Sequence, residues 1–372
     1  MKNIKSLDIY DIEKEMYREE YINVAEYDEL EIRFKTLSKE KKIPIAKPYE
    51  LEEMYTKLTS NNLTIQNEME ELKCKELLRS VSYYNIKHFI SNEFGKHEMK
   101  KFKDLEILYD FDRFLVGWLF SILNKLEIHL RTTMVEVFLN EIEIDSEDKA
   151  LFYLDETIYF KEENGMLNKT NQKIIEYNKL QNSFYKAVIK NRTKNNIKYN
   201  LDKYGVVPAW VLFDYLTLGE LSNFYYRILS SHKNKFATKL ERHIFENTGE
   251  DVKLPSKILG PWLNSIRYLR NKVSHTEIIY GKNFDITSAK HDSDKYYYEI
   301  LEENKYENRL VVFLLAMKML YKSMTNKDIV YWNNRMDELK AESEQSEVIK
   351  LTRLGILKDD IEYLKIACKP LT

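Results

Sequence analysis

The chain is poor in the residues that turns, tight strand bends and phosphate loops require. Its 372 residues include nine Gly and six Pro. Because these two residues supply the special backbone angles of turns, their scarcity argues against a barrel, a sandwich or a glycine-looped nucleotide-binding sheet. No two glycines lie within ten residues of each other, which excludes the Rossmann and Walker phosphate loops.

Cysteine clusters and long apolar runs are also lacking. Cys74 and Cys368 lie far apart, which argues against a zinc site, an iron–sulfur centre or a disulfide framework. The N-terminus is charged and has no apolar core of the kind found in signal peptides. The longest apolar run, Leu310–Met317, is far shorter than the ~18 residues that suggest a membrane span. We therefore expect a cytoplasmic protein without membrane contact, metal or cofactor.

The abundant residues favour helices. Lys, Glu, Leu, Ile, Asn and Tyr dominate, and 32% of the residues are charged. The 58 Lys and Arg nearly balance the 60 Asp and Glu, for a formal net charge of -2. This balance excludes a uniformly basic nucleic-acid binder but leaves room for a local basic face. The composition predicts an all-α fold.

Charge and proline divide the chain into three predicted parts. Residues 1–48 form an acidic N-terminal helical arm, with six basic and ten acidic residues within 1–36. Residues 49–325 form the main helical domain, and residues 326–372 form charged C-terminal helices. Within the main domain, residues 161–203 hold ten basic and four acidic residues. This basic insertion is either a helical hairpin or a partly ordered excursion.

Hydrophobic periodicity predicts six helices in the main domain, including a short one near residues 51–63 and a buried one near residues 308–324. One helix runs from Met69 toward Gly95. The next covers residues 111–142 and carries a broad apolar stripe, so it should be central. Residues 206–229 are predicted to form another helix of the core, with Pro208 near its start. A further helix starts after Pro261 or slightly before it.

This last helix carries a group of residues suited to RNA cleavage. Arg270, Asn271 and His275 lie at its polar margin, and Asn271 and His275 are neighbours one turn apart. His275 could take a proton from a ribose 2′-OH or give one to the leaving 5′-oxygen. Arg270 could hold the phosphate through two bonds and stabilise transition-state charge, so no metal is required. On its own, Arg-Asn-x-x-x-His is a weak motif that also occurs for structural reasons.

The wider context resembles a known bacterial family. Residues Arg270–His275 resemble the R-(polar)-x3-H motif of HEPN ribonucleases. Three other stretches are similar to the Abi-like abortive-infection proteins of the AbiD/AbiF group: Val81–Tyr84, Leu126–Arg131, and Pro208–Trp210 with Leu218–Ser222. Their order and approximate spacing match that family across residues 49–325. The resemblance implies an all-helical HEPN-like bundle, cleavage or binding of RNA, and defence against phage.

The chain departs from the family pattern at a few positions. Asn85 stands where the tyrosine pair is usually followed by Arg, and Thr276 and Ile278 stand where the motif often continues with a second His and an Arg. The Arg, the polar second residue and the His are intact. The resemblance therefore implies that Arg270, Asn271 and His275 are the catalytic residues.

Supporting residues are predicted around this motif. Glu127 and Arg131 are one helical turn apart, as in an ordinary helix-surface ion pair. The match to the family equally favours a role in supporting the catalytic residues or in contacting RNA. Arg267, in the same helix as His275, is a third supporting candidate.

The basic insertion is the candidate RNA-binding surface. Its cations alternate with Asn and lie near Tyr185 and Tyr199. The predicted RNA-binding residues are Lys186, Lys190, Arg192, Lys194 and Lys198. They form either an ordinary solvated face or a track for phosphates.

We therefore expect a metal-independent endoribonuclease that arrests growth as a toxin in phage defence. HEPN enzymes usually join two motifs across a two-fold axis, and this chain carries one, so a homodimer with Arg270 and His275 from both subunits in one cleft is expected. An antitoxin or a cognate non-coding RNA is a further candidate partner. Two alternatives stay open: a non-catalytic module that holds a structured small RNA, and a helical protein-interaction scaffold.

Overall fold

A computed structural model describes most of the chain after residue 47. The described residues are 48–369 apart from 61–62, 93–99, 144–148, 164–165 and 358–359. The chain divides into two compact units, Met1–Met54 and Tyr55–Thr372. The predicted acidic arm lies outside the described residues except for Pro48. All helices from α4 onward belong to the second unit.

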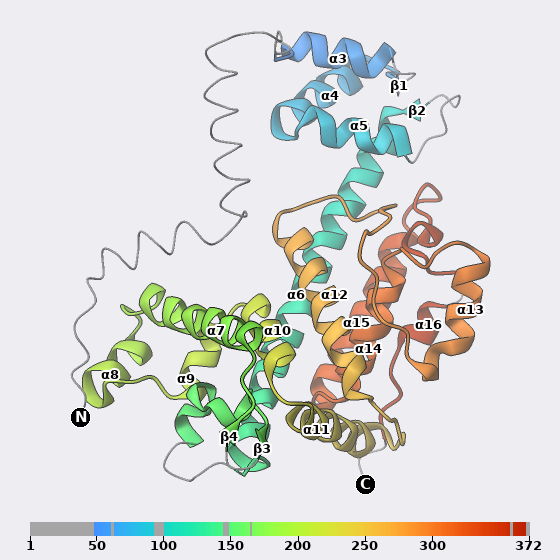
Figure 1. Cartoon of the computed structure of the whole chain (residues 1–372). Coiled ribbons are helices and arrows are strands. Elements are labelled where there is room, and N and C mark those ends of the chain that lie inside the picture. Colours follow the sequence, from blue (N-terminus) through green and yellow to red (C-terminus); the bar gives the residue numbers. More distant parts are fainter. Residues whose placement is uncertain are drawn as a thin grey trace. The chain divides into compact units, whose positions relative to one another are not determined.

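Helices dominate the described residues, which confirms the all-α prediction (Figure 1). The α-helices are α3 (Leu51–Ser60), α4 (Glu68–Ser80), α5 (Tyr83–Asn92), α6 (Phe102–Asn140), α7 (Asn171–Lys190), α8 (Asn195–Tyr204), α9 (Ala209–Leu212), α10 (Leu218–Arg227), α11 (Ser230–Thr248), α12 (Ser256–Ser274), α13 (Lys295–Glu303), α14 (Val311–Lys322), α15 (Asn326–Ser343) and α16 (Ile361–Leu364). Short 3-10 helices are η1 (Lys149–Leu154), η2 (Glu156–Ile158), η3 (Phe213–Tyr215), η4 (Asp292–Asp294) and η5 (Leu351–Leu354).

Strands are confined to two short pairs among these residues. β1 (Leu63–Thr64) pairs in parallel with β2 (Lys100–Lys101), with Leu63 opposite Lys100. β3 (Glu162–Glu163) pairs antiparallel with β4 (Met166–Leu167). Each strand has two residues, so these pairs tie loops together and form no layer of the fold.

Helix α6 is the element on which the others pack. It has 39 residues, and its predicted apolar stripe is buried at Leu115, Leu119 and Leu126. Helices α4, α5, α11, α12, α14 and α15 all contact it (Figure 1). The helix begins at Phe102 and not at residue 111, because Phe102 and buried side chains after it continue the same stripe.

The single helix predicted from Met69 is wrong, because the chain breaks between α4 and α5. Val81 is extended, with φ -128 and ψ 140, and its N–H ends α4 by donating to the Leu77 carbonyl. The carbonyl of Ser82 then accepts from Ile86 at 3.3 Å, in the first turn of α5. Ser and β-branched Val are weak helix formers, and Ser favours helix starts. The break buries Tyr83 and leaves Tyr84 exposed.

The basic insertion contains two helices in its described part. Helix α7 begins after Thr170, whose hydroxyl accepts from the Lys173 N–H. Helix α8 ends at Gly205, whose φ of 71 is the left-handed conformation that glycine adopts readily. Helix α7 packs on α10, and the Arg227 Nε donates to the Glu176 carbonyl at 3.0 Å. The insertion is thereby joined to the helix that packs against α12.

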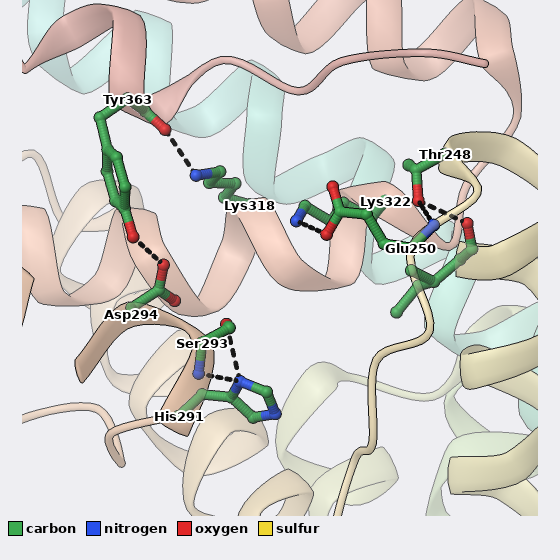
Figure 2. A network of polar contacts seen from close by, with 9 residues as sticks. Thr248, Glu250, His291, Ser293, Asp294, Lys318, Lys322 and Tyr363 are labelled. Carbon is green, nitrogen blue, oxygen red and sulfur yellow. Dashed lines mark hydrogen bonds and ion pairs between the residues drawn. The ribbon is translucent and has the colours of Figure 1, made fainter. Parts of the chain in front are cut away.

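Helix α14 is buried along its whole length and carries two lysines into the interior. Lys318 donates from Nζ to the Tyr363 carbonyl, and its Nζ lies 4.0 Å from the centre of the Tyr363 ring. Lys322, one turn later, pairs with Glu250 at 2.5 Å. The Tyr363 hydroxyl donates to Asp294 at 2.6 Å. Figure 2 shows this network, which ties α14 to α16 and to the segment that follows α11.

Burial makes Lys318 sensitive to pH. The residue is 8% exposed, and burial lowers its pKa from 10.5 to about 8, against the opposing effect of Asp294. Between pH 8 and pH 10.5 the unfolded chain binds a proton at Lys318 that the folded chain has released. The contribution of Lys318 to the free energy of unfolding therefore rises with pH across this window.

We predict that Lys318→Met removes this dependence. Between pH 7.5 and pH 9 the free energy of unfolding of the parent should rise by about 1 kcal/mol more than that of the variant. Urea unfolding followed by circular dichroism at both pH values measures the difference. Lys327→Met, which removes an exposed lysine, should keep the parent's pH response. Identical pH responses of the parent and Lys318→Met would contradict the prediction.

Candidate functional site

Helix α12 carries the predicted catalytic motif. Its apolar side is buried as predicted at Leu263, Ile266, Leu269 and Val273. The helix begins at Ser256, with Pro255 at the N-cap and Pro261 inside its second turn. The helix thus starts five residues earlier than Pro261 suggests, because Ile258 and Leu259 extend the buried side. It packs against α6, α10, α11 and α14, which sets the face that it turns to solvent.

The motif residues lie on that outer face at the end of α12. Asn271 and His275 are exposed, whereas Arg267 and Arg270 are partly buried. His275 is the C-cap residue, and its N–H donates to the Asn271 carbonyl at 3.0 Å. The His275 ring makes no hydrogen bond or ion pair to the described residues. An exposed imidazole at a fixed backbone position is accessible to a ligand.

Glu127 holds two arginines at this site. It is 7% exposed, and its Oε1 accepts from Arg131 Nη2 at 2.5 Å. Its Oε2 lies 3.5 Å from Arg270 Nε. Taking a carboxylate out of water is unfavourable unless cations and hydrogen bonds compensate. Glu127 is therefore an anchor shared by both arginines, and more than the surface ion pair that spacing alone suggests.

Arg270 keeps donors free on its outer edge. Its side chain is 37% exposed, and the pair with Glu127 is its sole ion pair within the described part of the chain. A guanidinium has five N–H donors. Nε is the Arg270 nitrogen in the pair with Glu127. The terminal N–H groups make no hydrogen bond to the described residues, and two parallel bonds from them match a phosphate.

The second arginine connects this anchor to α10. Arg131 Nη2 also donates to the Leu216 carbonyl at 2.8 Å. Leu216 is extended, and the chain restarts as α10 through a capping box between Thr217 and Glu220. The continuous helix predicted for residues 206–229 is therefore wrong, since α9, η3 and α10 replace it. The Leu218–Ser222 stretch singled out from the sequence begins the helix that packs on α12.

Arg267 lies one turn before Asn271 and faces its own helix. Its Nη2 donates to Asn264 Oδ1 at 2.7 Å. Its Nε is buried without a hydrogen-bond partner in the described residues. A Cβ added at Gly219 would meet the Arg267 Cδ at 3.6 Å, so the side chain runs along the start of α10. Arg267 lies beside the motif, and its supporting role stays a prediction.

The turn after His275 is a Schellman motif built on an unfavourable residue. The N–H of Thr276 donates to the Val273 carbonyl, and that of Glu277 to the Lys272 carbonyl, both at 3.0 Å. Thr276 has a φ of +53. Glycine usually occupies this position, because a β-carbon clashes there. A β-branched threonine in this conformation is strained.

Residues of α6 hold this strained turn. Arg113 Nη1 donates to the Thr276 carbonyl at 3.0 Å. Asp112 is fully buried, pairs with Arg113, and accepts from the N–H groups of Ile279 and Tyr280 at 2.7 Å each. Sequence reasoning missed Asp112 and Arg113. The sequence does carry one signal for Asp112: this acidic residue falls at a position of the apolar stripe of α6.

The predicted RNA-binding cations lie apart from this site. Lys186 and Lys190 are on α7, Arg192 and Lys194 are in the turn that follows, and Lys198 is on α8. All except Lys186 are exposed. Among the described contacts, none joins these five residues to Arg270 or His275.

Two further observations concern metals and membranes. Within the described ranges, no group of three or more His, Cys, Asp or Glu side chains is placed to hold a metal ion. None of the described helices combines the length and apolar character that a membrane crossing needs.

Comparison with known families gives one match. The family described as Abi-like protein matches residues 76–281, more than half of the 372 residues. The matched range extends from within α4 to the turn after α12. It includes Glu127, Arg131, Arg270 and His275. Comparison with curated proteins and with solved structures finds no match.

We predict that Thr276→Gly stabilises the protein. Glycine relieves left-handed strain of roughly 1–2 kcal/mol, and its greater flexibility in the unfolded chain offsets part of this gain. The free energy of unfolding should therefore rise by about 0.5–1 kcal/mol. Ser274→Gly, two residues earlier in ordinary helical conformation, should lower it by about 0.5–1 kcal/mol. Urea titrations of the three proteins under one condition make the comparison. A loss of stability in Thr276→Gly would show that the turn is not strained.

Proposed function

Because the chain belongs to the Abi-like protein family, we propose that it acts in abortive infection as a metal-independent endoribonuclease. One observation carries the proposal. Glu127 pairs with Arg270 at Nε, and the terminal guanidinium groups make no hydrogen bond to the described residues, at the same helix end that exposes His275. An anion-binding fork beside an exposed imidazole suits attack on a phosphodiester.

The proposed reaction is transesterification of the RNA backbone. His275 accepts the proton of a ribose 2′-OH, and the 2′-oxygen forms a bond to the adjacent phosphorus. The bond from phosphorus to the 5′-oxygen breaks, and a protonated His275 supplies the proton that this oxygen takes up. Arg270 stabilises the charge that builds on the phosphate oxygens, and Asn271 orients the imidazole or the ribose. The products are a 2′,3′-cyclic phosphate and a 5′-OH.

Residues around the motif have supporting roles in this proposal. Glu127 and Arg131 set the direction of Arg270. The Arg267 side chain runs along the start of α10 beside it. The cations of the basic insertion bind RNA at a surface separate from the cleavage site. Four of these five cations are exposed, which is what contact with phosphates requires.

We predict that cleavage depends on Arg270 and His275 and continues in EDTA. His275→Ala should lower the cleavage rate on the order of 10²–10⁴-fold. Arg270→Lys should lower it on the order of 10²-fold, because lysine keeps the charge and loses the fork. His243→Ala, which removes a partly exposed histidine on α11, should keep full activity. End analysis of labelled RNA should show the cyclic phosphate.

Other results would favour the alternatives. RNA binding without cleavage by the purified protein would favour a non-catalytic module that holds a structured RNA. Absence of both binding and cleavage would favour a protein-interaction scaffold. A fully toxic His275→Ala protein in cells would contradict the catalytic assignment directly.

We propose further that the enzyme acts as a homodimer. One chain supplies a single His275, and the reaction needs both a proton acceptor and a proton donor. Two exposed copies of this residue in one cleft would serve both steps.

We predict that the active species sediments as a dimer. Mixing Arg270→Ala with His275→Ala should not restore full activity if each cleft needs both residues from both chains. Analytical ultracentrifugation across a dilution series, with activity measured at each concentration, tests the assembly. A strictly monomeric protein with full activity would contradict it.

A further inference from the structure

Helix α8 and the turn after it expose large aromatic side chains. Tyr199 is 56% exposed and Tyr204 is 55% exposed. Trp210, on the neighbouring helix α9, is also exposed. Contiguous exposed apolar surface is uncommon on soluble proteins and often marks a binding site.

Two of these rings and a lysine form one unit. The centres of the Tyr199 and Tyr204 rings are 6.5 Å apart, with an interplanar angle of 85°. Lys203 Nζ lies 5.3 Å from the Tyr199 ring centre and 4.8 Å from the Tyr204 ring centre. The same Nζ donates to the Tyr199 hydroxyl at 2.9 Å. The lysine thus lies next to both rings, while each ring keeps about half of its surface in water.

The surroundings of this unit are positively charged. Lys194, the N-cap residue of α8, and Lys198 on that helix precede the unit and are exposed. The whole insertion holds ten basic and four acidic residues. The hydrogen bond that Lys203 donates to the Tyr199 hydroxyl raises the pKa of Lys203 above its ordinary value of 10.5. Exposed π-faces next to cations are the features that bind single-stranded nucleic acid.

We propose that Tyr199, Lys203 and Tyr204 form a binding site for single-stranded RNA. An unpaired base stacks on an exposed tyrosine face, and Lys203 binds the adjacent phosphate. Duplex RNA offers no such contact, because its bases already stack on one another. This inference rests on RNA being the ligand of the proposed function, and it adds a requirement for unpaired bases at a defined place.

The test uses two double variants of the full chain, one that lacks both tyrosine rings and one that keeps them. Tyr199→Ala/Tyr204→Ala removes both rings, and Tyr199→Phe/Tyr204→Phe keeps them and removes the hydroxyls. Both are made in a His275→Ala background, so that RNA stays intact. The probes are a single-stranded oligouridylate carrying one 2-aminopurine, whose fluorescence stacking quenches, and a duplex of the same length.

The alanine pair should weaken single-strand binding about tenfold or more and abolish the quenching, whereas the phenylalanine pair should match the parent. Duplex affinity should be equal in all three proteins. The slope of affinity against salt should also be unchanged in the alanine pair, because stacking releases no counterions. By contrast, a variant with Gln at Lys186, Lys190, Arg192, Lys194 and Lys198 should flatten that slope.

The outcomes separate this site from the proposed function. Unchanged single-strand affinity in the alanine pair, with His275-dependent cleavage intact in the wild-type protein, would overturn the stacking site alone. Equal losses for single strands and duplex would also overturn it, since stacking discriminates between them. A wild-type protein that neither binds nor cleaves RNA would overturn both proposals. Thermal unfolding of each variant checks that the exposed substitutions leave the fold intact.

Discussion

The buried carboxylate of Glu127 is the interaction on which the arrangement of the site depends. It lies on α6 and pairs with Arg270 of α12 and with Arg131, which in turn binds the Leu216 carbonyl before α10. A carboxylate buried without cations would be unfavourable by several kcal/mol. Three segments therefore meet at this carboxylate. The apolar packing of α12 sets the face that it turns to solvent, and the pair with Glu127 keeps Arg270 on that side near the helix end that exposes His275.

Two regions of the proposed enzyme differ in character. The end of α12 and the turn after it are held by polar contacts to α6, so their positions are set by the fold before any ligand arrives. Such preorganisation is what electrostatic stabilisation of a transition state needs. The insertion instead presents exposed cations and exposed rings, which suit a flexible polymer bound through many weak contacts. Positioning of the reacting bond and capture of the strand are thereby assigned to different helices.

Much of the fold follows from local sequence, and the site follows only in part. The apolar stripes of α6 and α12 are visible in the spacing of their leucines, and the spacing of Glu127 and Arg131 predicts their ion pair. The helix breaks at Val81 and Leu216 were missed because capping contacts, and not periodicity, decide them. The contact from Arg113 to Thr276 joins positions 163 residues apart. No local pattern encodes such a contact, although a charged residue within an apolar stripe is a hint of one.

Arg113 and Glu127 act as two clamps on the end of α12 and the turn after it, and both come from the uninterrupted helix α6. This limits the insertions and deletions that α6 can accept between them. Arg113 and Glu127 are separated on α6 by about four turns, or roughly 21 Å. Arg113 contacts Thr276 in the turn after α12, and Glu127 contacts Arg270 on α12. Inserting or deleting one residue between them would rotate one clamp by about 100° relative to the other. Homologues that keep both clamps should therefore vary freely in the identity of the exposed residues between these positions, but never in their number.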